Sequence, residues 1–364
     1  MAVTAREAIG RLKPYVGGKP AEEVQRELGL SDVVKLSSNE NPLGPSPQAL
    51  AAVRESLPGV HLYPDLHYYH LKRTLAGHLE VPEEWIICGN GSDDLIRLVA
   101  ETFLEPGAEA VLPTPSFSTY EYAVRLAGAN PVFVPLRDWV HDLEAMARAI
   151  TPRTRLVVIC NPNNPTGTIV GDGHLRAFLD RVPPGVLVAI DEAYHDYADD
   201  PDFPRSLELV REQRDVVLWR TFSKIYGLAG MRLGYAVSCP GIIRPLAAAW
   251  TPFAVNRLAQ VAGVAALADQ AHRDRSRRLN RDEKEFLYRE LSRLGLSYLP
   301  TQANFILIDL ARPCRPVYQA LLARGVIVRP AESFGLPGHI RVTIGRRTDN
   351  ERFIAALAAV LEQA

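Results

Sequence analysis

The sequence predicts an α/β fold, in which a large domain is built on a mostly parallel central sheet and a smaller α+β domain follows. Short runs rich in Val, Ile and Leu alternate with longer segments in which apolar residues recur every three or four positions. Strands that are apolar along their whole length and separated by helices are typical of a parallel sheet covered on both faces. Ligands of such sheets bind beyond the carboxyl ends of the strands, so the polar residues that follow each run form the candidate site.

The segment between about residue 85 and residue 236 contains the runs expected to form the central sheet. These strands are expected at 85–88, 110–112, 156–160, 186–190 and 216–219. Helices are expected between them, notably at 92–103 and 116–127, where the apolar residues have helical spacing.

After residue 236 the pattern changes to that of a smaller α+β unit. Helices are expected at 247–268, which is alanine-rich, at 282–294 and at 349–361, and strands at 304–308, 326–328 and 340–344. We therefore predict three parts: an N-terminal arm over 1–30 that packs with the small domain, a large domain over 31–245 and a small domain over 246–364.

The composition is that of an ordinary soluble globular protein, with 364 residues, 47% hydrophobic and 23% charged. A formal net charge of -1 gives no reason to expect nucleic acid or an anionic membrane as a partner. The charge-dense run 272–285 is mixed in sign, and we interpret it as the solvated face of a long helix. The sequence shows no Cys-x-x-Cys spacing among its 4 cysteines, no apolar stretch of about 20 residues and no signal-peptide-like start. A cytoplasmic protein with reduced thiols is therefore expected.

Chemically distinctive residues gather after two neighbouring strands. The loop after strand 216–219 carries two hydroxyls, a lysine and an arginine, namely Thr221, Ser223, Lys224 and Arg232. Asp191 ends strand 186–190. An amine for a Schiff base, donors for a phosphate and an anion for a ring nitrogen are what a phosphorylated pyridine aldehyde requires. This combination predicts an enzyme that uses pyridoxal 5'-phosphate.

Each of these residues also has a simpler interpretation. Lys224 by itself could be a solvated surface lysine, and Asp191 could cap a helix or, with His195, bind a metal. A metal site is not expected, because no second His or carboxylate cluster follows. The Gly-rich segment 89–94 could bind phosphate at a helix N-terminus or could be a tight turn capped by Ser92 or Asp93.

The motifs at 161–167 (Asn-Pro-Asn-Asn-Pro-Thr-Gly), 191–194 (Asp-Glu-Ala-Tyr) and 223–232 resemble those of fold-type I, aspartate-aminotransferase-like pyridoxal-phosphate enzymes. Finer features are similar to the histidinol-phosphate aminotransferase family, and they lie at 12–15, 36–44, 63–65, 325–330 and 339–345. The resemblance covers essentially the whole chain. It implies a fold-type I transferase fold and a homodimer whose subunits share active sites.

The resemblance also implies roles for individual residues toward the cofactor. Lys224 would bond covalently to it and move the substrate proton, and Asp191 would pair with the pyridine nitrogen. Asn164 and Tyr194 would contact the phenolate oxygen, and Phe117, where the family often has Tyr, would stack on the ring. The phosphate would be held by Ser92, Asp93, Thr221, Ser223 and Arg232, and by Tyr63 of the neighbouring subunit.

For the substrate, the resemblance implies an anion site made by Arg329 and Arg341, with Tyr15 and Asn39 assisting. Two guanidiniums give bidentate donors to a phosphate or carboxylate, although both could instead pair with acids of the small domain. His67 and His70 stand where relatives commonly have a Gly-containing turn, so the shape of the substrate pocket is left open.

The implied reaction is a transamination between histidinol phosphate or imidazole acetol phosphate and glutamate or 2-oxoglutarate, in histidine biosynthesis. Three alternatives stay open at this point. They are an aromatic-amino-acid aminotransferase of the same subfamily, a threonine-phosphate decarboxylase on the same scaffold, and a non-catalytic, cofactor-sensing regulator. The regulator would require a DNA-binding extension, which the sequence does not suggest.

Overall fold

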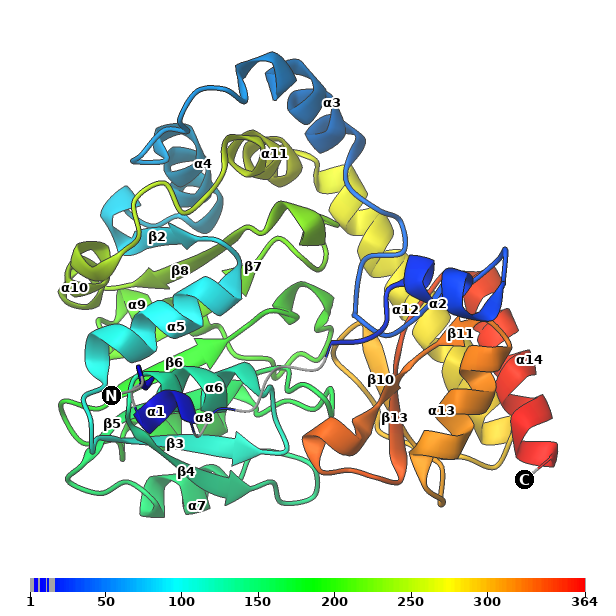
Figure 1. Cartoon of the computed structure of the whole chain (residues 1–364). Helices are drawn as coiled ribbons and strands as arrows, with labels where there is room; N and C mark the ends of the chain where they lie inside the picture. Colours follow the sequence, from blue (N-terminus) through cyan, green and yellow to red (C-terminus); the bar gives the residue numbers. More distant parts are fainter. Residues whose placement is uncertain (1–2, 6, 11, 13–16, 364) are drawn as a thin grey trace.

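The computed structural model describes residues 3–5, 7–10, 12 and 17–363. Its centre is a seven-stranded sheet with the order β2-β8-β7-β6-β5-β3-β4 (Figure 1). The strands are β2 (Ile86–Gly89), β3 (Glu109–Thr114), β4 (Asn130–Pro135), β5 (Thr154–Cys160), β6 (Leu187–Asp191), β7 (Val216–Thr221) and β8 (Gly234–Ser238). Strand β8 runs antiparallel to both of its neighbours, and the other pairs are parallel. The predicted fold class is confirmed. The five runs expected from the sequence form β2, β3, β5, β6 and β7, and the structure adds β4 and β8 to them.

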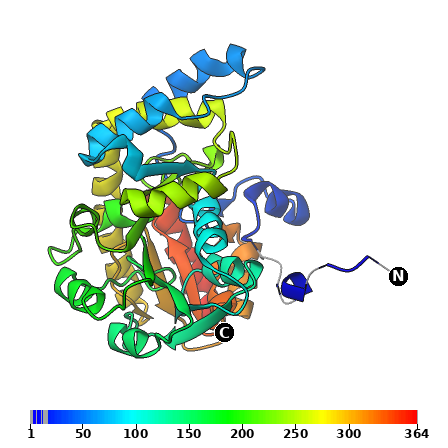
Figure 2. The same ribbon diagram turned by 90° about the vertical axis from the view of Figure 1, so that its left-hand side faces the viewer.

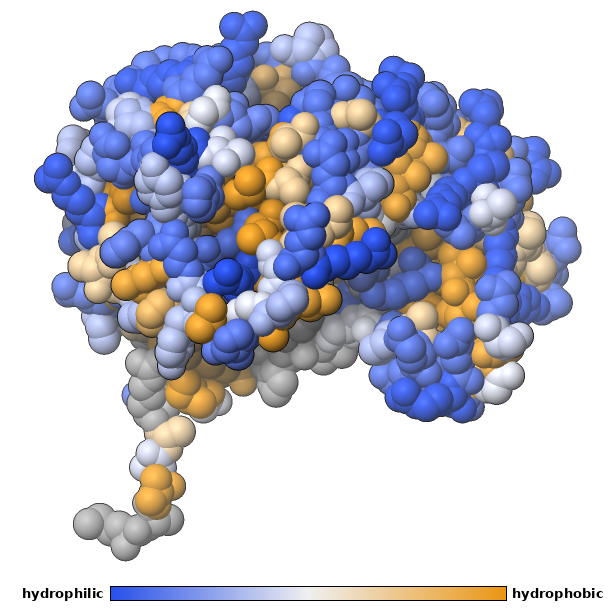
Figure 3. Space-filling view, turned by 90° about the horizontal axis from the view of Figure 1, so that it is seen from above, coloured by the Kyte–Doolittle hydropathy of each residue, from blue (hydrophilic) through white to orange (hydrophobic). Residues whose placement is uncertain are grey.

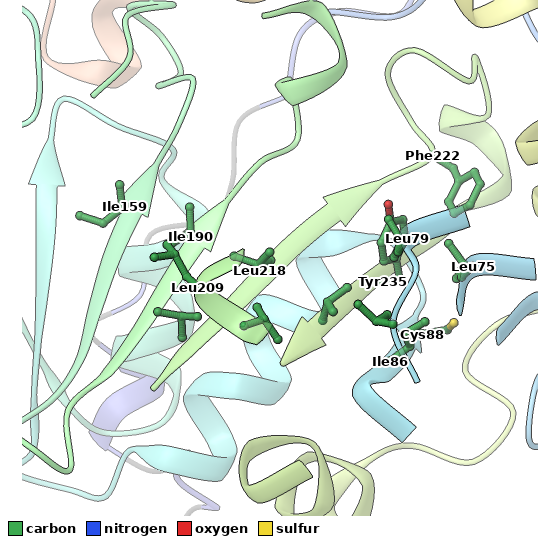
Figure 4. Close-up of a cluster of buried hydrophobic side chains, with 14 of the residues drawn as sticks. Leu75, Leu79, Ile86, Cys88, Ile159, Ile190, Leu209, Leu218, Phe222 and Tyr235 are labelled. Carbon is green, nitrogen blue, oxygen red and sulfur yellow. The ribbon is translucent and has the colours of Figure 1, made fainter. Parts of the chain in front are cut away.

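Helices cover both faces of this sheet, as near-continuous apolar strands require. One face packs against α5 (Ser92–Phe103), α6 (Thr119–Leu126) and α10 (Pro240–Ala249). The other packs against α4 (Tyr69–Leu79), α7 (Leu143–Arg148), α8 (Asp172–Leu179), α9 (Ser206–Arg211) and α11 (Arg257–Ala268). Figure 4 shows part of this second core, in which Ile159, Ile190 and Leu218 project from adjacent strands of the sheet.

The C-terminal part has its own sheet and core. Four antiparallel strands have the order β12-β13-β10-β9, and they are β9 (Ser297–Tyr298), β10 (Phe305–Asp309), β12 (Arg329–Pro330) and β13 (His339–Thr343). They pack with α12 (Gln270–Arg293), α13 (Cys314–Ala323) and α14 (Arg347–Glu362). Short 3₁₀ helices occur at η1 (Leu57–Gly59), η2 (Glu83–Trp85), η3 (His195–Tyr197), η4 (Ala229–Met231) and η5 (Ala331–Phe334).

The N-terminal segment is divided between the two parts rather than packed only with the C-terminal one. Helix α1 (Glu7–Gly10) lies beside α6 and stands off the body of the molecule (Figure 2). After α2 (Ala21–Leu28), strand β1 (Val34–Lys35) pairs in parallel with β11 (Val326–Ile327). Residues just beyond the expected arm thus join the C-terminal part, because β11 offers them a strand edge, and α3 (Pro47–Ser56) follows.

The single helix expected at 247–268 is wrong. Helix α10 ends at Ala249 and α11 begins only at Arg257. Pro252 disfavours helical backbone at the residue before it, and the extended Asn256 caps α11 by accepting a hydrogen bond from the Ala259 N–H at 2.8 Å.

The interpretation of 272–285 as a solvated face is also wrong in part. The run does lie on one long helix, α12, but Arg273, Glu283 and Lys284 are buried. The Lys284 ammonium donates to the Thr301 carbonyl at 3.3 Å, and the Glu283 carboxylate accepts from the Arg347 guanidinium at 3.1 Å. These charges are buried because each has a partner on another element, which a helical pattern alone does not reveal.

Across the described part of the chain, no helix combines the length and the apolarity needed to cross a membrane. The same residues contain no group of three or more His, Cys, Asp or Glu side chains placed to hold a metal ion.

Candidate active site

A cavity of about 260 Å³ opens beyond the carboxyl ends of β5, β6 and β7 and is bordered by residues of β12 and β13. Most of the site residues expected from the sequence line it. They are Asn39, Ser92, Asp93, Phe117, Asn164, Asp191, Tyr194, Thr221, Ser223, Lys224, Arg232, Arg329 and Arg341. Residues more than 300 positions apart in the chain therefore meet at one place, where an α/β sheet is expected to bind its ligand.

Two expected residues are not among this lining. Tyr15 lies outside the residues that the structure describes. Tyr63 is 81% exposed, and the centroid of its ring lies 4.8 Å from that of the Phe253 ring.

Asp191 lies in the wall of the cavity, at the end of β6, and is buried. One carboxylate oxygen accepts a hydrogen bond from the Tyr120 hydroxyl at 2.6 Å, and the other accepts from the Ala193 N–H at 3.0 Å. Burial raises the pKa of Asp191 to about 6, although both hydrogen bonds act in the opposite direction. The group is therefore an anion at neutral pH, poised to pair with a buried cation.

Lys224 reaches the same cavity from the loop after β7. Its ammonium donates to the Ser38 carbonyl at 3.3 Å and lies 5.6 Å from the centre of the Tyr194 ring. Burial, and next the positive charge of Arg341, lower the pKa of Lys224 to about 8. An appreciable fraction of the amine is thus neutral, and hence nucleophilic, just above neutral pH.

One end of the cavity is suited to a phosphate group. The first N–H groups of the 12-residue helix α5, at Ser92 and Asp93, border the cavity, and a helix N-terminus favours an anion. The Arg232 guanidinium lies across from them, donating to the Asp93 carboxylate at 3.1 Å and to the Ser223 hydroxyl at 3.4 Å.

Two glycines permit this close arrangement. A Cβ at Gly91, whose φ is +82°, would lie 2.4 Å from an Arg232 Nη, and a Cβ at Gly234 would lie 2.6 Å from the Ser92 nitrogen. Only glycine at both positions lets the guanidinium and the helix N-terminus converge. Cationic donors, a helix N-terminus, an amine of lowered pKa and a buried carboxylate together fit pyridoxal phosphate.

Tyr194 connects the central sheet with the N-terminal segment. Its hydroxyl accepts a hydrogen bond from the Asn39 side-chain amide at 3.0 Å, and burial raises its pKa above the usual value. Asn39 is held in turn by β13, since its backbone N–H donates to the Thr343 hydroxyl at 2.9 Å. The side chain of Asn39 is thereby fixed against the cavity wall.

Arg341 and Arg329 stand opposite each other on the paired strands β13 and β12. Directly opposite residues of antiparallel strands project from the same face, so both guanidiniums border the cavity. Arg341 donates to the Asn164 side-chain oxygen at 2.6 Å and to the Ser37 carbonyl at 2.8 Å, and Arg329 donates to the Ser333 hydroxyl at 3.2 Å. Two buried cations side by side make this wall strongly attractive to an anionic group.

Sequence reasoning missed several residues of the cavity. They are Ser37, Ser38, Glu40, Ser118, Tyr120 and Phe334, among others. Tyr120 lies three residues after Phe117, which precedes α6, and its place in the amphipathic helix expected at 116–127 was the available signal. The serines lie beside Asn39, but their carbonyls, rather than their side chains, accept from Arg341 and Lys224.

Comparisons with known proteins agree with this geometry. The family model described as aminotransferase class I and II matches residues 31–357. The chain is 55% identical to a histidinol-phosphate aminotransferase of Moorella thermoacetica, covering 98% of this chain and 92% of that protein. It is 52% identical to the corresponding protein of Symbiobacterium thermophilum, covering 98% and 99%.

Solved structures give the same picture. The structure is similar, with a TM-score of 0.91 and 29% identity, to histidinol-phosphate aminotransferase from Sinorhizobium meliloti in complex with pyridoxal-5'-phosphate, covering 100% of this chain and 99% of that one. It is also similar to an aspartate aminotransferase double mutant of Thermus thermophilus, with a TM-score of 0.86, 25% identity, and coverage of 99% and 100%.

Proposed function

This chain belongs to the class I and II aminotransferase family, and on that premise we propose that it is a pyridoxal-phosphate-dependent histidinol-phosphate aminotransferase. In this reaction glutamate gives up its amino group and leaves as 2-oxoglutarate, and imidazole acetol phosphate receives it to become histidinol phosphate. The observation that carries the proposal is one cavity that joins Lys224 and Asp191 to the paired arginines 329 and 341.

We propose that the cofactor is held through the groups just described. Arg232, Ser223, Thr221 and the N-terminus of α5 would hold its phosphate, and Asp191 would pair with its ring nitrogen. Asn164, Tyr194 and Phe117 border the remaining wall and would hold the ring itself. When bound, pyridoxal phosphate supplies a carbonyl that takes up amino groups and a ring that stabilises negative charge at the substrate Cα.

Lys224 performs the proton transfer. Its Nζ would be the amine that holds the cofactor in the resting enzyme and the base that moves the substrate Cα proton during the reaction. Its lowered pKa suits this exchange, because a general base acts best when its pKa is near the working pH.

The two arginines orient both substrates. Arg341 and Arg329 would grip the phosphate of the imidazole substrate and, in the other half of the cycle, a carboxylate of glutamate. Asn39 borders the same wall and would contribute a further amide donor. Binding energy from these remote anions holds the reacting carbon in position beside Lys224.

A homodimer is proposed from an apolar face that no described element covers. Exposed large hydrophobic residues gather around η1, α4 and the start of α11, and they include Leu57, Val60, Leu62, Tyr63, Tyr69 and Phe253. Figure 3 looks onto this side and shows hydrophobic residues interspersed across it. From the family resemblance we propose that Tyr63 of the partner subunit reaches this chain's phosphate site and that Tyr15 assists at the substrate end.

We propose that the chain divides into a large domain over 31–245 and a small domain over 246–364. Residues 34–36 form backbone hydrogen bonds with the small domain. A cytoplasmic location is proposed from the thiols, because Cys88, Cys160, Cys239 and Cys314 are all free.

A steady-state assay tests the substrate assignment. Purified holoenzyme is given 2-oxoglutarate with either histidinol phosphate or phenylalanine, and glutamate formation is measured. We expect kcat/KM for histidinol phosphate to exceed that for phenylalanine by at least about a hundredfold, since only the former offers the arginines a phosphate. A higher kcat/KM for phenylalanine would make the chain an aromatic aminotransferase instead.

A further inference from the structure

Tyr120 borders the cavity but has no role in the scheme above. It lies on α6, it is 2% exposed, and its hydroxyl donates to the Asp191 carboxylate at 2.6 Å. A buried hydroxyl bonded to a carboxylate over 71 positions of sequence is a specific contact rather than a local one. Charge-assisted hydrogen bonds of this length are about twice as strong as those between neutral groups.

Packing holds the Tyr120 ring in place on two sides. The ring stacks on Trp219 of β7, with centroids 6.2 Å apart and planes inclined by 21°. Its edge meets Phe117 at 5.6 Å and 85°. Tyr120 therefore links the ring expected to stack on the cofactor with the carboxylate expected to pair with the cofactor nitrogen.

The groups around Asp191 make its ionisation depend on the Tyr120 hydroxyl. Besides Tyr120, the titratable groups that act on it include Cys160 of β5, Asp93 of α5, and Glu192 and Tyr194 of its own loop. Cys160 is neutral, because burial raises the pKa of its thiol to about 12, and Tyr194 is neutral for the same reason. The nearby carboxylates of Asp93 and Glu192 raise the Asp191 pKa further, so these neighbours supply no cation that could hold Asp191 ionised.

We propose that Tyr120 is a positioning residue, whose hydroxyl fixes the Asp191 carboxylate in its ionised form and aims it at the ring nitrogen of pyridoxal phosphate. The inference rests on the proposed cofactor and deepens it. The Tyr120 hydroxyl itself stays protonated, because burial and the Asp191 charge raise its pKa well above 10. The Tyr120 hydroxyl is thus always a donor. Without it, burial would raise the Asp191 pKa further, because only the hydrogen bond from the Ala193 N–H would act in the opposite direction.

The experiment measures binding of pyridoxal phosphate to the apoenzyme between pH 5 and pH 8 by fluorescence quenching and visible absorbance. Tyr120→Phe keeps both ring contacts and removes only the hydroxyl. Tyr122→Phe is the matched control, because Tyr122 lies on the same helix and is 43% exposed. We expect Tyr120→Phe to bind pyridoxal phosphate about tenfold more weakly than wild type. We also expect the acid limb of its pH profile, where affinity falls as the pH falls, to lie at higher pH. Tyr122→Phe should show neither change.

Asp191→Asn separates positioning from packing. In that background Tyr120→Phe should weaken binding no further, since there is no carboxylate to hold. An equal loss in both backgrounds, or an acid limb that does not move, would overturn the proposal and leave Tyr120 as a packing residue.

A comparison of wild type with Asp191→Asn does not depend on the folding of the Tyr120 variant. The acid limb of wild type should differ from that of Asp191→Asn, because only the wild type titrates Asp191 in this range, and identical acid limbs in the two proteins would also overturn the proposal. Failure of the proposed substrate assignment is distinguishable, because it would appear as a higher kcat/KM for phenylalanine in the steady-state assay while the wild-type apoenzyme still bound pyridoxal phosphate.

Discussion

Replacing Arg341 by alanine tests the proposed anion site. Arg341 is 6% exposed and its guanidinium lies 5.2 Å from the centre of the Phe305 ring, so a substrate phosphate bonded to it would be largely desolvated. Removing one partner of a buried, hydrogen-bonded charge pair costs about 2–5 kcal/mol. We therefore expect kcat/KM for histidinol phosphate to fall by roughly 30- to 5,000-fold, mostly through KM.

A second effect of Arg341→Ala follows from electrostatics. The positive charge of Arg341 is the second largest cause of the lowered pKa of Lys224. Its removal should therefore raise the pKa of Lys224 and shift the pH profile of kcat to higher pH.

The assay is a comparison of steady-state kinetics and cofactor titration in wild type, Arg341→Ala and Arg315→Ala. Arg315 is a suitable control because its side chain is 58% exposed in the same part of the chain and pairs with Glu332. Loss of cofactor affinity with an unchanged KM for histidinol phosphate would refute the reasoning and move the anion site elsewhere.

Further outcomes follow from the same geometry. Lys224→Ala should abolish turnover in the glutamate assay, and activity near that of wild type would contradict the assigned proton transfer. Gly91→Ala should weaken cofactor binding beyond any loss of stability, whereas Gly107→Ala, with a φ of +90° and open space around the added Cβ, should only lower the melting temperature. Equal cofactor affinity in the two glycine variants would argue against the phosphate site.

In the apoenzyme, Lys224→Met should increase the free energy of unfolding relative to wild type by more at pH 7 than at pH 10, as measured by urea unfolding. The folded-state pKa of Lys224, about 8, lies below its ordinary value of 10.5, so the destabilisation that its charged form causes in the wild type fades as the pH rises between these two values. A pH-independent difference would contradict the lowered pKa of Lys224.

The polar residues at strand ends were predictable because a parallel sheet brings them together regardless of loop detail. Asp191 follows β6 and Lys224 follows β7, and these strands are hydrogen-bonded neighbours. The sequence pattern therefore predicts that the Asp191 carboxylate and the Lys224 amine lie in one cavity.

Other features depended on tertiary packing that no local pattern encodes. Tyr120 meets Asp191 only because α6 lies over the sheet at a particular rotation. Glu283 and Lys284 are buried by partners from α14 and from the loop before β10, although their helix looks solvated in sequence. Tyr63 does not line the cavity of its own chain, so its proposed role depends on a second subunit.

A single-turnover spectrum tests directly whether histidinol phosphate is the substrate. Holoenzyme is mixed separately with histidinol phosphate, glutamate, phenylalanine and threonine phosphate, and loss of the visible cofactor band is followed. We expect rapid conversion by histidinol phosphate and glutamate at low concentration, and slow conversion by phenylalanine and threonine phosphate. Rapid conversion by phenylalanine with little by histidinol phosphate would contradict this expectation, as would decarboxylation of threonine phosphate.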